Sequence, residues 1–88
     1  MGFFGNLKKE TYINQLASSF KLLYDCGDMA AIECMRKNYS ANELKIILNE
    51  LKEIAGGKVI TRFELEQSSP FKENYDEVAE IDRRHSGN

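Results

Sequence analysis

Tryptophan is absent from this chain, proline occurs once, and cysteine occurs only twice. Cys26 and Cys34 do not make a disulfide framework, and with the single histidine, His85, they cannot supply the four ligands of a structural zinc site. No stretch approaches the roughly 20 apolar residues of a membrane helix. The N-terminal residues also lack the apolar run and cleavage pattern of a signal peptide. We therefore expect a cytoplasmic protein with free thiols, without metal or cofactor, and without stable membrane insertion.

A length of 88 residues corresponds to one domain, which we place at 1–88 with flexible ends at about 1–5 and 85–88. A chain this short buries only about 60–65% of its unfolded surface, so its core is marginal. Domains of this size often gain stability by pairing with a copy of themselves or with a partner. The net charge is −2, and residues 64–88 carry three basic against seven acidic side chains. This acidic end argues against a nucleic acid partner.

The strongest folding signal runs from Ser40 to Gly57. Ser40 and Glu43 have the spacing of a capping box, in which each side chain binds the other residue's free backbone N–H. Gly56 and Gly57 follow an apolar stripe and suit the left-handed conformation that ends a helix. The buried stripe is expected to contain Leu44, Ile47, Leu48, Leu51, Ile54 and Ala55. These features predict a helix with a defined start, a defined core face and a defined stop.

Three further helices are predicted around this one. Apolar residues at steps of three and four predict a first helix that begins near Asn6 and ends before a left-handed Gly27. Asp28 is expected to cap a short helix at 29–37, which Asn38 closes in the left-handed conformation. Ser69 followed by Pro70 predicts the start of a last helix at 70–84. Their expected core residues are Ile13, Leu16, Ala17, Phe20, Leu23, Tyr24, Ala31, Ile32, Met35, Phe71, Tyr75, Val78 and Ile81.

Residues 58–66 allow two interpretations. Apolar and polar residues alternate there and β-branched residues open the run, which is typical of a strand. However, Thr61 and Glu64 also match a capping box, so a helical turn can begin at this point. A single strand needs a mate, and the chain offers no second one. The predicted fold is therefore a mainly α, four-helix domain, with one short β segment at 58–66 as the open alternative.

The candidate chemical groups do not assemble into a catalytic site. His85 lies in the expected loose end, whereas a general base must be held within hydrogen-bond reach of its substrate. Cys26 follows Asp25 at a helix C-terminus, where no positive field lowers a thiol pKa. Cys34 is expected to be a small core residue. We therefore expect no catalytic residue, and a protein that is not an enzyme.

Apolar residues outside the predicted stripes give the best functional signal. Leu22 lies nearly opposite the core face of the first helix, and Ile46 lies about 140° from the stripe of the third helix, at about 100° per residue. Together with the other candidates they form the expected protein interface: Phe3, Phe4, Leu22, Ile46, Ile60 and Arg62. The sequence thus favours a small protein-interaction module of the adaptor or inhibitor type that forms a homodimer. The alternative is a nucleic-acid-binding regulator that uses a helix-turn-helix-like pair at 28–55.

Overall fold

The structure, a computed structural model, describes residues 2–68 and 74–85, with side chains for residues 8–67 and 74–85. Five helices make up this part of the chain: α1 (Gly2–Tyr24), α2 (Asp28–Asn38), α3 (Ala41–Ala55), α4 (Arg62–Ser68) and α5 (Tyr75–His85). The mainly α fold is thus confirmed. No strand occurs in residues 2–68 or 74–85.

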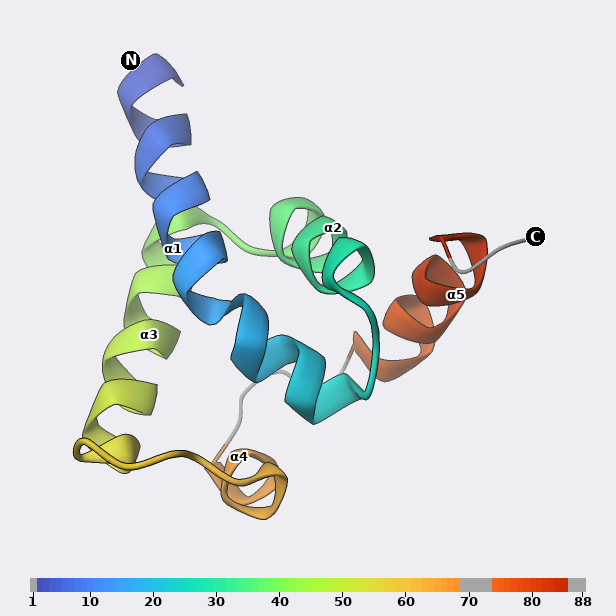
Figure 1. Cartoon of the computed structure of the whole chain (residues 1–88). Coiled ribbons are helices and arrows are strands. Elements are labelled where there is room, and N and C mark those ends of the chain that lie inside the picture. The colour runs from blue at the N-terminus through green and yellow to red at the C-terminus, as the bar shows by residue number, and fades with distance from the viewer. Residues whose placement is uncertain (1, 69–73, 86–88) are drawn as a thin grey trace.

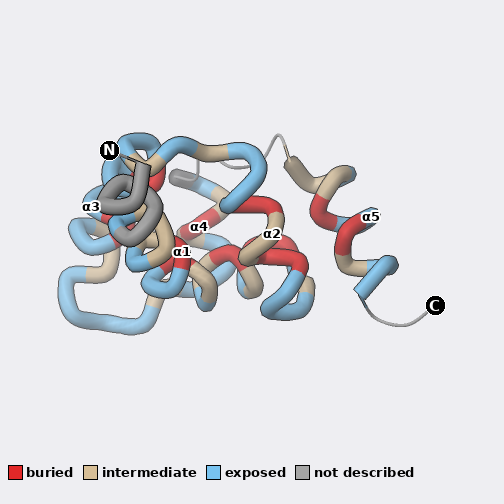
Figure 2. The backbone as a smooth tube through the Cα atoms, turned by 90° about the horizontal axis from the view of Figure 1, so that it is seen from above, coloured by how far each residue is buried: buried red, intermediate tan, exposed pale blue. Residues whose placement is uncertain are grey.

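Helix α1 organises the fold, because it contacts all four other helices. In Figure 1, α3 lies beside α1 on one side, α2 lies on the other side, and α4 lies below. Helix α5 packs mainly against α2 and forms the far end of the molecule. Most buried residues accordingly lie on the central helices, and α5 contributes a shorter buried stretch (Figure 2).

The core contains only apolar residues among those whose side chains are described. Its members come from all five helices: Ile13, Leu16, Phe20, Leu23, Tyr24, Ala30, Ala31, Cys34, Met35, Leu44, Ile47, Leu48, Leu51, Leu65, Val78 and Ile81. Most of the expected core positions are therefore confirmed, while Ala17, Ile32, Ile54 and Tyr75 are partly buried around this cluster. Phe71 lies outside the described residues, as does the predicted helix start at Ser69 and Pro70.

Helix α3 has the termini that its sequence predicts. The Ser40 hydroxyl accepts a hydrogen bond from the Glu43 N–H (3.1 Å), and the Glu43 carboxylate accepts one from the Ser40 N–H (2.8 Å). Gly56 ends the helix in the left-handed region with φ 51°. Glycine adopts this conformation without the steric cost that a Cβ brings. Both ends of the central prediction are confirmed.

The strand alternative for residues 58–66 is wrong, and the helical alternative is right. The Thr61 hydroxyl accepts from the Glu64 N–H at 3.3 Å, and the Glu64 carboxylate accepts from the Thr61 N–H at 3.0 Å. This capping box begins α4. Because a helix turns about 100° per residue, Leu65 is buried while Phe63 faces solvent. A strand would have placed the two side chains on one face.

The connections around α1 and α2 differ from the predictions. Helix α1 begins at Gly2, four residues before the predicted start at Asn6. Asp25, with φ 53°, takes the left-handed conformation expected of Gly27, which is extended and precedes α2. The Gly27 N–H donates to the Asp82 carboxylate of α5 at 2.9 Å, a partner far along the chain.

The predicted caps of α2 are also wrong. Asp28 is its first helical residue, and Gly27 precedes it without a side-chain cap. Asn38 is the last helical residue and does not take the left-handed conformation, and its side-chain amide donates to the Cys34 carbonyl one turn earlier (3.1 Å).

Candidate functional site: an apolar groove beside α1

Two of the predicted interface residues meet at one place on the surface. Leu22 of α1 and Ile60, which precedes α4, line the same open groove of about 260 Å³. The rest of its lining comes from Ser18, Ser19, Ala55, Lys58 and Val59. The groove thus lies where the C-terminal half of α1 meets the end of α3 and the connection to α4. We call it the Leu22 groove.

The exposure of its apolar lining is the unusual feature of this groove. Leu22 is 42% exposed and Val59 is 88% exposed. Ile60 is partly buried and packs against the core, so it fixes the position of the connection. Single exposed apolar residues are normal on a protein surface. Here two of them converge on a hollow, which is typical of a contact surface.

Charges at the groove are already neutralised within the chain. The Lys58 ammonium lies 3.0 Å from the Glu64 carboxylate. Hydrogen bonds from the Thr61 backbone and from Lys58 hold the pKa of Glu64 below its ordinary range. The capping carboxylate is therefore ionised at neutral pH, and the groove presents mostly apolar surface to a partner.

Neither Ile46 nor Arg62 belongs to the lining of this groove. Ile46 is 51% exposed on α3 but is not part of the groove lining. Arg62 is the first residue of α4 and pairs with Glu66 one turn later at 3.4 Å. The side chains of Phe3 and Phe4 lie outside the described residues, although their backbone belongs to α1. Among the candidates whose side chains are described, the structure therefore brings Leu22 and Ile60 together.

Sequence reasoning missed Val59, Phe63 and Met29 as exposed apolar residues. Phe63 is 70% exposed, and Met29 is also exposed near the start of α2. The signal for Phe63 was the Thr61 capping box, because a helix that begins there directs Leu65 inward and Phe63 outward. The exposure of Val59 depends on the path of the connection, for which the sequence has no local signal.

His85 has a defined position at the opposite end of the molecule. It is the last residue of α5 instead of part of a loose end, and its Nε2 lies 2.8 Å from the Glu33 carboxylate of α2. Arg84 donates to the other oxygen of Glu33 at 2.8 Å. These two bonds hold the pKa of Glu33 below its ordinary value. The cluster fastens α5 to α2, and each charged member has a partner within the chain.

The thiols are poorly suited to nucleophilic chemistry. Burial, with Asp82 nearby, raises the pKa of Cys26 to about 11, and burial also raises the pKa of Cys34. Both are therefore protonated at neutral pH, whereas the thiolate is the reactive species. Within the described residues, no group of three or more histidine, cysteine or acidic side chains could hold a metal ion.

Comparison with known proteins gives no relative: no protein-family model, no curated protein and no solved structure matches this chain. Among the described helices, none is long and apolar enough to cross a membrane. The function must therefore be inferred from the surface of this molecule alone.

Proposed function

We propose that this chain is a small, non-enzymatic protein-interaction module of the adaptor or inhibitor type, which self-associates through the Leu22 groove. The observation that carries the proposal is the convergence of exposed Leu22 and Val59, with Ile60, on one hollow. A second copy is the first partner to consider, because two-fold pairing is the commonest way to close such an interface. The small core gives the same expectation, since pairing adds buried area to a marginal domain.

The size of the groove sets the expected strength of the dimer. Fully burying an aliphatic side chain contributes about 1.5–3 kcal/mol, so covering the exposed parts of Leu22, Val59 and Ile60 contributes roughly 3 kcal/mol per copy. Two copies therefore contribute roughly 6 kcal/mol. Because association costs about 4–15 kcal/mol, the groove anchors the contact and the surrounding surface must supply the rest. We expect weak self-association.

The test is the mass in solution as a function of concentration. Light scattering should report a mass above that of the monomer at about 100 µM, where a weak complex with a micromolar dissociation constant is populated. Leu22→Asp and Val59→Asp should return the mass to that of the monomer, because each places a charge in the apolar contact. Ile46→Asp is the matched control, since Ile46 is similarly exposed but lies outside the groove.

Two outcomes would contradict this proposal. If the wild-type chain stays monomeric at every concentration, the proposed self-association is wrong. If Ile46→Asp abolishes the dimer as completely as Leu22→Asp does, the groove is not the specific contact. The charged variants alter exposed positions, so circular dichroism should show the same helix content as the wild type.

No specific observation favours the alternative, a nucleic-acid-binding regulator that uses residues 28–55. The two helices of that pair, α2 and α3, each pack on α1, which lies between them (Figure 1). Glu50 and Glu53 on the exposed side of α3 would face the phosphates of a nucleic acid bound there, whereas phosphate contact requires an excess of basic residues.

A further inference from the structure

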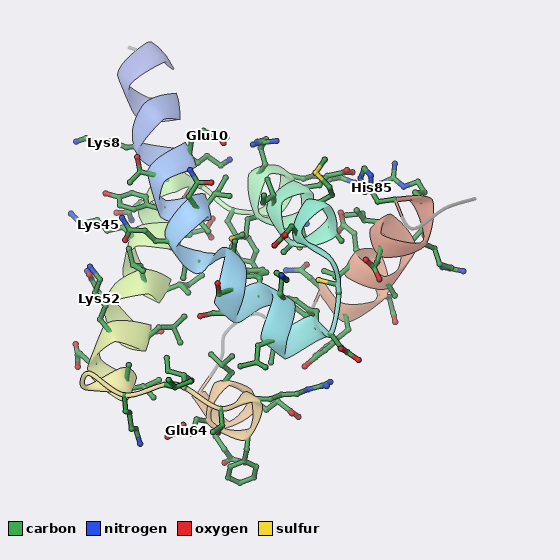
Figure 3. The ribbon with its side chains drawn as sticks, in the orientation of Figure 1. Lys8, Glu10, Lys45, Lys52, Glu64 and His85 are labelled. Atoms are coloured by element: carbon green, nitrogen blue, oxygen red, sulfur yellow. The ribbon has the colours of Figure 1, made fainter. Side chains whose placement is uncertain are left out.

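Three lysines share the edge where α1 and α3 lie side by side. Lys8 belongs to α1, and Lys45 and Lys52 belong to α3. Figure 3 shows all three side chains at the same margin of the molecule, pointing away from it. All three are exposed. We call them the lysine edge.

The lysine edge differs from the rest of the charged surface in its pairing. Most other basic side chains that the structure describes bind a carboxylate or a carbonyl of the chain: Lys9, Lys21, Arg36, Lys37, Lys58, Arg62 and Arg84. Within the described part of the chain, none of the three edge lysines makes such a contact. Their positive charge is therefore available to another molecule.

The distance between the lysines of α3 determines which spacing of negative charges a binding partner needs. Lys45 and Lys52 are seven residues apart, which places them about 20° apart around the helix and about 10 Å apart along it. Asn49, also exposed, lies on the same face between them. In an extended chain, residues two or four apart point to the same face and lie about 7 or 13 Å apart. Because lysine side chains are long and flexible, two carboxylates at either interval can reach Lys45 and Lys52 together.

We propose that the lysine edge binds a carboxylate-rich segment of a partner protein. Acidic peptide is favoured over nucleic acid by the number and the surroundings of the lysines. Three ammonium groups make few phosphate contacts, and the carboxylates of Glu50 and Glu53 lie about 80–160° around α3 from the lysines, where they repel a broad polyanion more than a narrow peptide. The lysine edge shares no residue with the Leu22 groove, so a partner can bind there independently of the proposed self-association. An adaptor needs such a second contact surface.

The experiment uses a fluorescein-labelled peptide of about ten glutamates, long enough at about 3.3 Å per residue to span the edge, and measures anisotropy at low and physiological salt. The test variant carries Lys8→Gln, Lys45→Gln and Lys52→Gln. The matched control carries Lys21→Gln, Lys37→Gln and Arg84→Gln, which removes the same charge from basic residues that pair within the chain and lie outside the Leu22 groove. Both variants alter exposed or partly exposed side chains, and circular dichroism should show the helix content of the wild type for each.

We expect the test variant to bind the peptide at least about fivefold more weakly than the wild type, and the control to bind within about twofold, because exposed ion pairs contribute little each and must act together. Equal loss in the two variants would show that net charge alone attracts the peptide and would overturn the proposal. Unchanged binding by the test variant would also overturn it. Tighter binding to an oligothymidylate of similar length, with a steep salt dependence, would assign the edge to nucleic acid instead.

The same measurement separates this inference from the proposed function. Leu22→Asp should bind the acidic peptide as the wild type does, even where it no longer self-associates. If the chain is monomeric at every concentration but binds the peptide through the lysine edge, the proposed self-association is wrong and the peptide-binding proposal stands.

Discussion

The side chains of Phe63 and Leu65 give the sharpest test of the fold, because a strand and a helix place them differently. In a strand they lie on one face, whereas in α4 they lie about 200° apart. The structure buries Leu65 completely and leaves Phe63 70% exposed. Replacing each by alanine therefore measures which geometry the chain adopts.

The expected magnitudes differ strongly. Leu65→Ala removes a fully buried side chain and should cost about 2–5 kcal/mol of unfolding free energy. Phe63→Ala alters a mostly exposed side chain and should stay within about 0.5 kcal/mol of the wild type. A domain of this length has a total unfolding free energy of about 4–13 kcal/mol, so the first change removes a large fraction of it.

Urea denaturation followed by circular dichroism measures both effects. With a slope of about 1.5 kcal/mol per molar urea, a loss of 3 kcal/mol lowers the midpoint by about 2 M, while the Phe63→Ala midpoint should barely move. Equal shifts for the two variants would show that the side chains share one environment. That result would refute the helical conformation of residues 62–68.

Three further predictions concern the cap, the acid stability and the thiols. Ser40→Ala removes the cap of α3 and should cost about 0.5–2 kcal/mol in the same urea assay, and an unchanged midpoint would contradict the capping geometry. The pKa of Glu33 is held below its ordinary value of 4.5, so its ion pairs stabilise the fold above that pH and are lost as pH falls through the lower, folded-state pKa. Glu33→Gln should therefore flatten the fall in stability between pH 5.5 and pH 3 (roughly the window in which a carboxylate titrates), and an identical fall in the two proteins would contradict this. A chelator with a reductant should leave the melting temperature unchanged, because neither Cys26 nor Cys34 forms a disulfide, and a clear drop would show a structural metal or disulfide.

The local features of the fold could be predicted from short sequence patterns. The Ser40–Glu43 capping box and the left-handed Gly56 depend on residues within one turn of each other, so the sequence was sufficient to place both ends of α3. The Thr61–Glu64 box was equally visible, but alternation of apolar residues gave a competing strand pattern. The structure decides for the helix, which buries Leu65 against the core and leaves Phe63 exposed.

The connection between α1 and α2 shows where local reasoning fails. Glycine is the default residue for the left-handed conformation, so Gly27 was the natural choice. Aspartate also tolerates that conformation, and Asp25 adopts it. The extended Gly27 donates to Asp82, 55 residues away, and an added Cβ would lie 3.4 Å from that carboxylate. No pattern near residue 27 contains this information.

The sequence alone determined that the chain is helical, where its central helix starts and stops, and that Leu22 and Ile46 lie outside the core. These properties follow from hydrogen bonds and periodicities that span three or four residues. Only the tertiary structure decided that Leu22 meets Ile60 in one groove, that Lys8 lies at the same margin of the molecule as Lys45 and Lys52, and that His85 reaches Glu33. Each of these juxtapositions depends on how whole helices pack around α1, which is set by the fit of many side chains at once, and a pattern within one helix cannot specify it.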